Sequence, residues 1–133
     1  MTVELAIANI QAKMLALSGM KAAPTVPPEG TAVFPFAVCY ERSGEMILHS
    51  SGFAQDLSII WAEIHVGRGL LGPAITQAMA FRDPFQVALM NDPTLGGTVS
   101  NFTTVRRTFG LLSWANVETI GYRWEIGLKV QVA

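Results

Sequence analysis

The residues best placed to do chemistry in this sequence are Glu63 and His65, two positions apart in an alternating segment. On a β-strand, that spacing puts both side chains on the same face. A histidine beside a carboxylate can serve as a general base or as a metal ligand. We favour the simpler interpretation of a polar pair on the exposed or interface side of a sheet, because two histidines without cysteine ligands make a poor zinc site.

The other candidate nucleophiles give weaker signals. Cys39 follows Val38 in an apolar segment without a basic neighbour, which favours a small buried apolar residue over a reactive thiol. The Ser-Gly pairs do not match the G-x-S-x-G pattern of a nucleophile elbow. The sequence therefore predicts a protein that is not an enzyme and that uses no cofactor and no metal ion.

A glycine-rich corner at Gly67–Gly72 has the G-x-G-x-x-G spacing of a dinucleotide-binding turn. Pro73 follows it directly, and the next acidic residue, Asp83, comes too early for the ribose contact expected about 20 residues further on. The predicted elements also lack the repeated βαβ order of such folds. A small-ligand binding module that uses this corner with His65 and Glu63 is the alternative hypothesis.

The composition indicates a chain that associates with other subunits. Only 14% of the 133 residues are charged, against about 25% in an average soluble domain. A single small domain has a large surface for its volume and normally covers it with charge. We therefore expect part of the surface to be covered by neighbours. The candidate interface residues are Trp61, Glu63, His65, Arg106 and Arg107.

Charge and hydropathy argue against several functions. A net charge of −1 gives no general attraction to nucleic acid, and the adjacent Arg106 and Arg107 point to opposite faces of a strand. We expect one of these arginines to meet a carboxylate across a subunit interface. No apolar run approaches the roughly 18 residues that span a bilayer, and no basic N-terminal segment suggests a secretory signal.

The N-terminal half is predicted to be a helix followed by strands. Apolar residues at positions 3, 7, 10, 14 and 17 define one helical face, with Thr2 as the cap. Residues 20–31 form a proline-rich linker or arm. Alternation predicts strands over 32–40, 46–49 and 58–66, with a hairpin turn at Glu41–Glu45. Pro35 marks the first strand as an edge strand or a bulge.

The C-terminal half adds a helix and two strands. The helix is expected from Pro73, as its first residue, to Met90, and Asp83-Pro84 should kink or break it by forming a second cap. The strands are expected over 99–107 and 120–132, and the last has the clearest period-two pattern. The order predicts one α+β domain over residues 1–133, with a largely antiparallel sheet and two helices packed on one face.

The segment Asn91–Val99 joins the second helix to the last strands. Pro93 ends the helix, because the residue before a proline is pushed out of the α region. The pair Gly96-Gly97 permits positive φ angles in the turn. We single out Asp92, Pro93, Leu95, Gly96 and Gly97 as a structural turn motif.

This motif and the order of parts resemble the tail terminator, or tail completion, proteins of long-tailed bacteriophages. In that family, a helix runs into a short acidic turn with a leucine and a glycine pair, and the chain finishes on a long strand. The resemblance covers most of the chain in layout and residues 91–99 in motif. It implies a structural protein that forms a homohexameric ring on the head-proximal end of the tail tube, ends tube polymerisation and joins the tail to the head connector.

The resemblance also implies partners and a location. The partners are further copies of the chain, the tail tube protein and the head connector or stopper protein, with no membrane and no sequence-specific nucleic acid, although DNA can pass through the ring. The location is the tail or neck of the virion, after assembly in the host cytoplasm. Another protein of the phage neck, such as a head-completion or stopper protein, is the alternative within this class.

Overall fold

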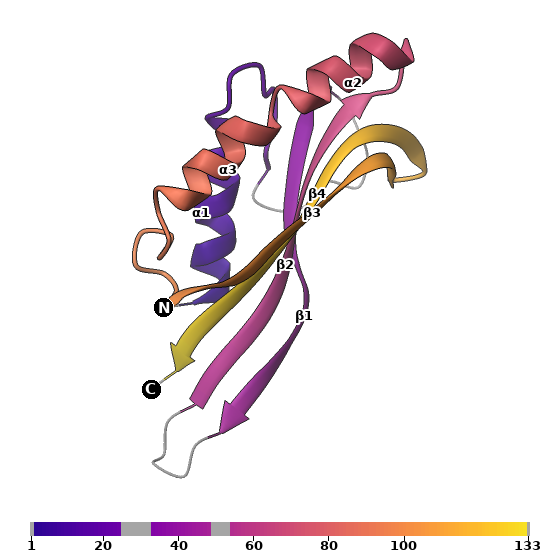
Figure 1. Cartoon of the computed structure of the whole chain (residues 1–133). Coiled ribbons are helices and arrows are strands. Elements are labelled where there is room, and N and C mark those ends of the chain that lie inside the picture. The colour runs from indigo at the N-terminus through magenta and orange to yellow at the C-terminus, as the bar shows by residue number, and fades with distance from the viewer. Residues whose placement is uncertain (1, 25–32, 49–53, 133) are drawn as a thin grey trace.

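The computed structural model describes residues 2–24, 33–48 and 54–132 (Figure 1). In chain order, the elements are α1 (Val3–Leu15), β1 (Phe36–Leu48), β2 (Ala54–Gly67), α2 (Leu71–Met79), α3 (Arg82–Met90), β3 (Asn101–Trp114) and β4 (Val117–Val132). A single sheet and helices that follow one another in this way make an α+β protein, so the predicted fold class is confirmed.

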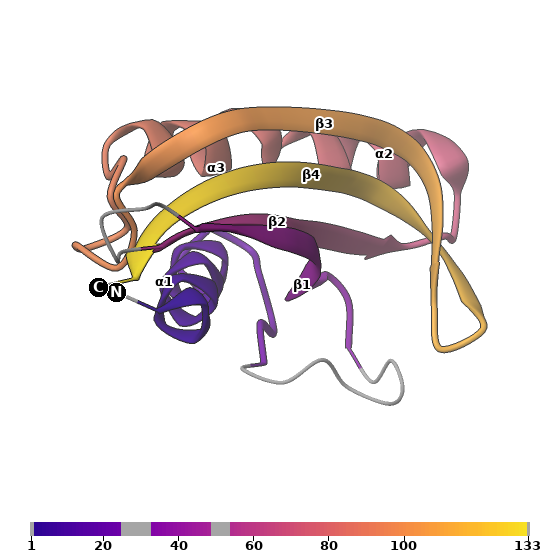
Figure 2. The same cartoon turned by 90° about the horizontal axis from the view of Figure 1, so that it is seen from below.

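The four strands form one sheet in the order β1-β2-β4-β3, and every strand pair is antiparallel. β2 and β4 lie at the centre, and β2 pairs with β4 along its whole length, from Ala54 opposite Val132 to Gly67 opposite Thr119. β1 and β3 are the two edges, and Figure 2 shows them on opposite sides of the curved sheet. Ala22 makes a short parallel bridge to Phe36 at the start of β1.

The helices pack on one face of the sheet, as predicted, and Figure 1 shows them on one side of the long strands. The core between these layers contains Ile60 and Ile64 of β2, and Trp124 of β4, all fully buried. Phe85 of α3 packs edge-on against Trp124, with 4.6 Å between ring centroids. The alternation predicted for the last strand is therefore confirmed over positions 120–130, because the even-numbered side chains of that range belong to this core.

α1 begins and packs as the sequence predicts. The Thr2 side chain accepts a hydrogen bond from the Leu5 backbone N–H at 3.2 Å and so caps the first turn. Ile10 and Met14 are fully buried, and Leu17, just after the helix, completes the predicted apolar face. The helix thus owes its position to the burial of this face against β1 and β2.

The predicted break in the second helix is confirmed, because α2 and α3 are separate helices. The predicted caps are wrong by two residues. α2 begins at Leu71 and α3 at Arg82, so Pro73 and Pro84 are each the third residue of their helix. Both prolines still lie in a first turn, where a backbone N–H has no intrahelical partner to lose.

The predicted hairpin turn at Glu41–Glu45 is wrong, because β1 continues through it to Leu48. A bulge between Glu41 and Ser43 takes up the extra residue. Gly44 is needed because the backbones of β1 and β2 approach each other closely here, and not because the chain turns. A Cβ at this position would lie 2.9 Å from the carbonyl oxygen of Leu57. The two strands predicted over 32–40 and 46–49 are thus one strand in the described region; residues 32 and 49, and linker residues 25–31, lie outside it.

The strand predicted over 99–107 is longer than expected and runs as β3 to Trp114. A two-residue turn at Ala115 and Asn116 then leads into β4, and both residues have positive φ, 51° and 65°. Positive φ at both central residues is the mark of a type I′ turn, whose twist matches the right-handed twist of the two strands of a hairpin. This hairpin could not be predicted from the sequence, because its turn contains no glycine and alanine rarely adopts positive φ.

The Asn91–Val99 turn links α3 to β3 and is tied to α1. The Asp92 carboxylate accepts hydrogen bonds from the Gly96 backbone N–H and from Lys13 Nζ, each at 2.9 Å. The hydrogen bond from Gly96 and, to a smaller extent, the one from Lys13 hold the pKa of Asp92 below its usual range. Leu95 has a φ of 49° and a fully buried side chain, so it anchors the turn in the core.

Replacement of either glycine of the turn by valine should destabilise the subunit. Gly96 and Gly97 have φ angles of 68° and 82°, a region that a β-branched residue strongly disfavours. We expect Gly96→Val and Gly97→Val each to lower the free energy of unfolding by about 1–3 kcal/mol in urea titrations. Gly69→Val is the control, because Gly69 has open space around it and its φ is not positive. Equal midpoints for all three variants would contradict a strained turn.

Candidate functional site

The face of the sheet opposite the helices carries a second buried group of side chains, near the β3–β4 turn. The Phe36 ring stacks on the imidazole of His65, with centroids 4.8 Å apart and planes within 7°. Trp114, the last residue of β3, lies 5.9 Å from the same imidazole. Figure 2 shows the β3–β4 hairpin bending away from the line of the sheet at this end. These rings leave His65 with no exposed surface.

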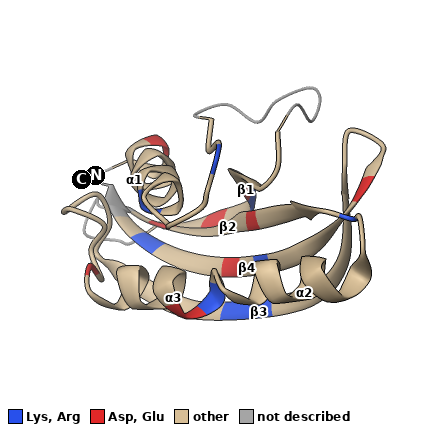
Figure 3. Cartoon of the chain, turned by 90° about the horizontal axis from the view of Figure 1, so that it is seen from above, with Lys and Arg blue, Asp and Glu red and all other residues tan. Residues whose placement is uncertain are grey.

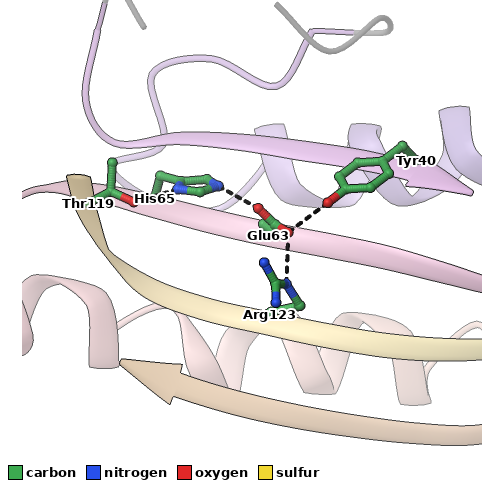
Figure 4. Close-up of polar contacts among 5 residues, drawn as sticks. All are labelled: Tyr40, Glu63, His65, Thr119 and Arg123. Carbon is green, nitrogen blue, oxygen red and sulfur yellow. Dashed lines mark hydrogen bonds and ion pairs between the residues drawn. The ribbon is translucent and has the colours of Figure 1, made fainter. Parts of the chain in front are cut away.

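Beneath the rings lies a hydrogen-bonded group that we call the polar cluster (Figure 4). It consists of Tyr40, Glu63, His65, Thr119 and Arg123. Glu63 accepts three hydrogen bonds: from His65 Nε2 at 2.8 Å, from Tyr40 Oη at 2.9 Å and from Arg123 Nε at 2.8 Å. The other imidazole nitrogen, Nδ1, lies 2.6 Å from Thr119 Oγ1. The cluster therefore joins β1, β2 and β4 through side chains.

Electrostatics favour an ionised Glu63 despite its burial. Burial acts to raise the pKa of this carboxyl, but the hydrogen bonds from His65, Arg123 and Tyr40 outweigh it and hold the pKa below the usual range. The pKa of the Tyr40 hydroxyl is raised, first by burial and then by the neighbouring Glu63 charge. Tyr40 is therefore a fixed donor to the carboxylate at neutral pH.

Trp61 lies beside the polar cluster on the same face and holds two cations. The guanidinium carbon of Arg123 lies 4.0 Å from the Trp61 ring centroid, and that of Arg42 lies 5.0 Å from it. Cations over an indole face are attracted by the ring quadrupole. Arg123 thus makes a charge pair with Glu63 and a ring contact with Trp61 at once, which fixes its orientation.

The polar cluster has the residue types of a catalytic relay but not its accessibility. Glu63, His65 and Thr119 are at most 1% exposed, so the hydroxyl that histidine could activate cannot meet a substrate in this conformation. The expectation that Glu63 and His65 lie on the exposed or interface side of a sheet is wrong, because both side chains are covered within their own chain. The arrangement instead holds three strands in register.

Sequence reasoning found Glu63 and His65 but missed the other members of the polar cluster. Tyr40, Thr119 and Arg123 belong to strands far away in the sequence, and only the pairing of those strands brings them to Glu63 and His65. For Thr119 and Arg123 the available signal was their place on the polar face of the last alternating segment, whereas Tyr40 shares a face with the apolar Phe36 and Val38. That signal identifies a face and not a partner.

The remaining candidate chemical groups are also accounted for by structure. Cys39 is buried on the helical face, and burial raises the pKa of its thiol to about 12, so the unreactive character predicted for it is consistent with its surroundings. The Gly67–Gly72 corner joins β2 to α2, but all three pairs of described strands are antiparallel, so these strands form no parallel βαβ unit of the kind a dinucleotide site uses. Within the described ranges, no group of three metal-ligating side chains occurs.

The structure places Arg106 and Arg107 on opposite faces of β3, as their adjacency predicts. Arg106 stands opposite Glu125 of β4 on the face of the polar cluster. Arg107 points to the helical face and donates a hydrogen bond to Gln86 Oε1 of α3 at 2.9 Å. The two arginines therefore do not form one basic patch for nucleic acid.

Comparison with known proteins gives no assignment: no protein-family model matches this chain, and no curated protein matches it. The described helices are all too short or too polar to cross a membrane. The structure thus defines the class, an α+β protein with an antiparallel four-stranded sheet.

Proposed function

We propose that this chain is a structural subunit that assembles into a ring and caps the head-proximal end of a bacteriophage tail tube. In this role it ends tube polymerisation, joins the tail to the head connector and catalyses no reaction. The phage assignment rests on the resemblance carried by the Asn91–Val99 turn and by the order of the elements. The ring has a further basis in the surface of the subunit.

The observation that supports the ring is that both edge strands of the sheet are exposed over long stretches and carry exposed apolar side chains. β3 is exposed along most of its length, including Val105, Phe109 and Leu111. On the other edge, β1 is exposed from Glu41 to Leu48. An exposed edge strand with apolar side chains is a template for pairing with another chain. Because the two edges lie on opposite sides of the subunit, contact between them is head-to-tail and can close into a ring.

Charge favours contact between unlike edges. β3 carries Arg106 and Arg107 and no acidic residue, whereas β1 carries Glu41 and Glu45 with Arg42. Edges of opposite net charge attract, and two β3 edges repel each other. Figure 3 shows that the other charged residues are spread over the remaining elements with both signs mixed, and α2 has none. A head-to-tail β1–β3 contact is therefore preferred over symmetric contacts.

Light scattering tests the ring. We expect a particle of about 86 kDa, six copies of the 14.4 kDa chain, either alone or after addition of the tail tube protein. Both conditions are needed because the tube can act as the assembly template. A chain that stays monomeric in both would contradict the ring.

Electron microscopy of phage particles that lack this chain tests which position in the phage neck it occupies. Loss of a tail terminator should give overlong tails, because nothing then ends tube polymerisation. Tails of normal length without attached heads would instead assign the chain to another neck position, such as the stopper.

A further inference from the structure

Helix α1 has a second apolar face, which points away from the core. Leu5, Ala8, Ala12 and Leu15 recur at spacings of three and four, and all four are exposed, the two leucines by more than half. We call these four residues the outer stripe. On a surface helix, the side opposite the core is normally polar. A helix that is apolar on both sides is covered on both sides in its working state.

A groove suited to such a helix lies at the opposite edge of the subunit, between α3 and β3. It has a volume of about 190 Å³ and is lined by Gln86, Leu89, Met90, Phe102, Val105, Arg107 and Trp124. Its lining is mostly apolar, and Met90 and Val105 are exposed. Gln86 accepts hydrogen bonds from Arg107 and from the Trp124 indole, which fixes the polar part of the lining. Such a groove can accept the apolar face of a helix.

We propose that the outer stripe of α1 docks into the α3–β3 groove of a second copy of this chain. α1 packs on the edge strand β1, whereas the groove lies along the other edge strand, β3; Figure 2 shows α1 near β1 and α3 near β3. The contact is therefore head-to-tail and uses each surface once per subunit. This inference rests on the ring of the proposed function and names the surfaces that close it.

Charge and side-chain size support this occupant. Arg107 is the one charged residue among those that line the groove. Glu4 flanks the outer stripe and is the only acidic residue of α1, while Lys13, its only basic residue, already pairs with Asp92 of its own chain. An acidic helix end facing a basic groove is complementary. The small side chains of Ala8 and Ala12 let the helix backbone approach the groove closely.

The test combines a charge variant with a matched control. Ala12→Glu places a carboxylate in the centre of the outer stripe at an exposed helical position, so folding should be unaffected, as circular dichroism can verify. Gln77→Glu adds the same charge on exposed α2, outside both surfaces. We expect Ala12→Glu to raise the dissociation constant of self-association at least about tenfold in analytical ultracentrifugation, and Gln77→Glu to leave it unchanged. An unchanged constant for Ala12→Glu would overturn the docking while leaving the ring intact.

Disulfide cross-linking identifies the partner surface. The native Cys39 is buried, so Ala8→Cys and Val105→Cys each add one accessible thiol. An oxidised mixture of the two variants should give a cross-linked dimer that neither variant gives alone. Cross-linking of Ala8→Cys with itself would show α1 against α1 and overturn the proposal, as would a wild type that stays monomeric both with and without the tail tube protein. If Ala12→Glu weakens self-association but phage particles that lack the chain have tails of normal length, only the tail-terminator role is contradicted, and the docking stands.

Discussion

Gly121→Ala should lower the free energy of unfolding by about 3 kcal/mol or more, the largest effect of an added methyl group that we expect at any described glycine. Gly121 lies in β4 opposite His65, and a Cβ there would overlap the carbonyl oxygen of Ile64 and reach 2.9 Å from its carbonyl carbon. The atoms that the new methyl group would meet belong to the backbone of β2 and cannot rotate away. The clash can therefore be relieved only if β2 and β4 move apart. Urea titration at neutral pH measures the effect.

Gly127→Ala is the matched control for this variant, because Gly127 is in the same strand. The added Cβ would meet the Thr103 hydroxyl, the end of an exposed side chain that can rotate away. We expect it to cost clearly less than Gly121→Ala. Equal costs for the two variants would mean that the approach of β2 to β4 at Gly121 is not as close as the structure has it.

Glu63→Gln should cost about 2–4 kcal/mol at neutral pH. The side chain is 1% exposed and its carboxylate is the common acceptor for His65, Tyr40 and Arg123. Glutamine keeps the shape of the side chain but removes its charge. Its amide nitrogen is a hydrogen-bond donor, and it would face side chains of the cluster that are donors as well. Arg123 is partly exposed and can turn to water, which keeps the cost at the lower end for a broken buried ion pair.

The same residue gives the subunit a pH dependence below neutrality. The folded pKa of Glu63 lies below its unfolded value of about 4.5, so the unfolded state takes up the proton first as the pH falls. The stability that the charge contributes is therefore complete above the unfolded pKa and is lost as the pH falls through the folded pKa. The difference between wild type and Glu63→Gln should accordingly be constant from pH 7 to about pH 5 and shrink below that.

A second substitution separates this effect from general acid denaturation. Glu118 is an exposed carboxylate on β4, outside the proposed contact surfaces, and Glu118→Gln should leave the stability near the wild-type value across the same range. A wild type and Glu63→Gln that differ by the same amount at pH 3 and pH 7 would contradict an ionised Glu63 in the folded state.

The sequence by itself determined the elements whose signal is local. The apolar face of α1, the alternation of β2 and β4, and the break between α2 and α3 follow from side-chain periodicity and from proline, which act within a few residues of the chain. Where local signals were ambiguous, prediction failed. Gly44 is equally suited to a turn and to a close approach, and only the neighbouring Leu57 carbonyl decides that it belongs to a strand.

Tertiary structure alone decided which faces meet. Tyr40, Thr119 and Arg123 reach Glu63 and His65 only because β1, β2 and β4 pair in one register, and a register is a relation between segments far apart in the sequence. The same holds for the surfaces of the proposed ring. Leu5 and Leu15 are as apolar in the sequence as Ile10 and Met14, and it is the packing of α1 on the sheet that buries one pair and leaves the other exposed.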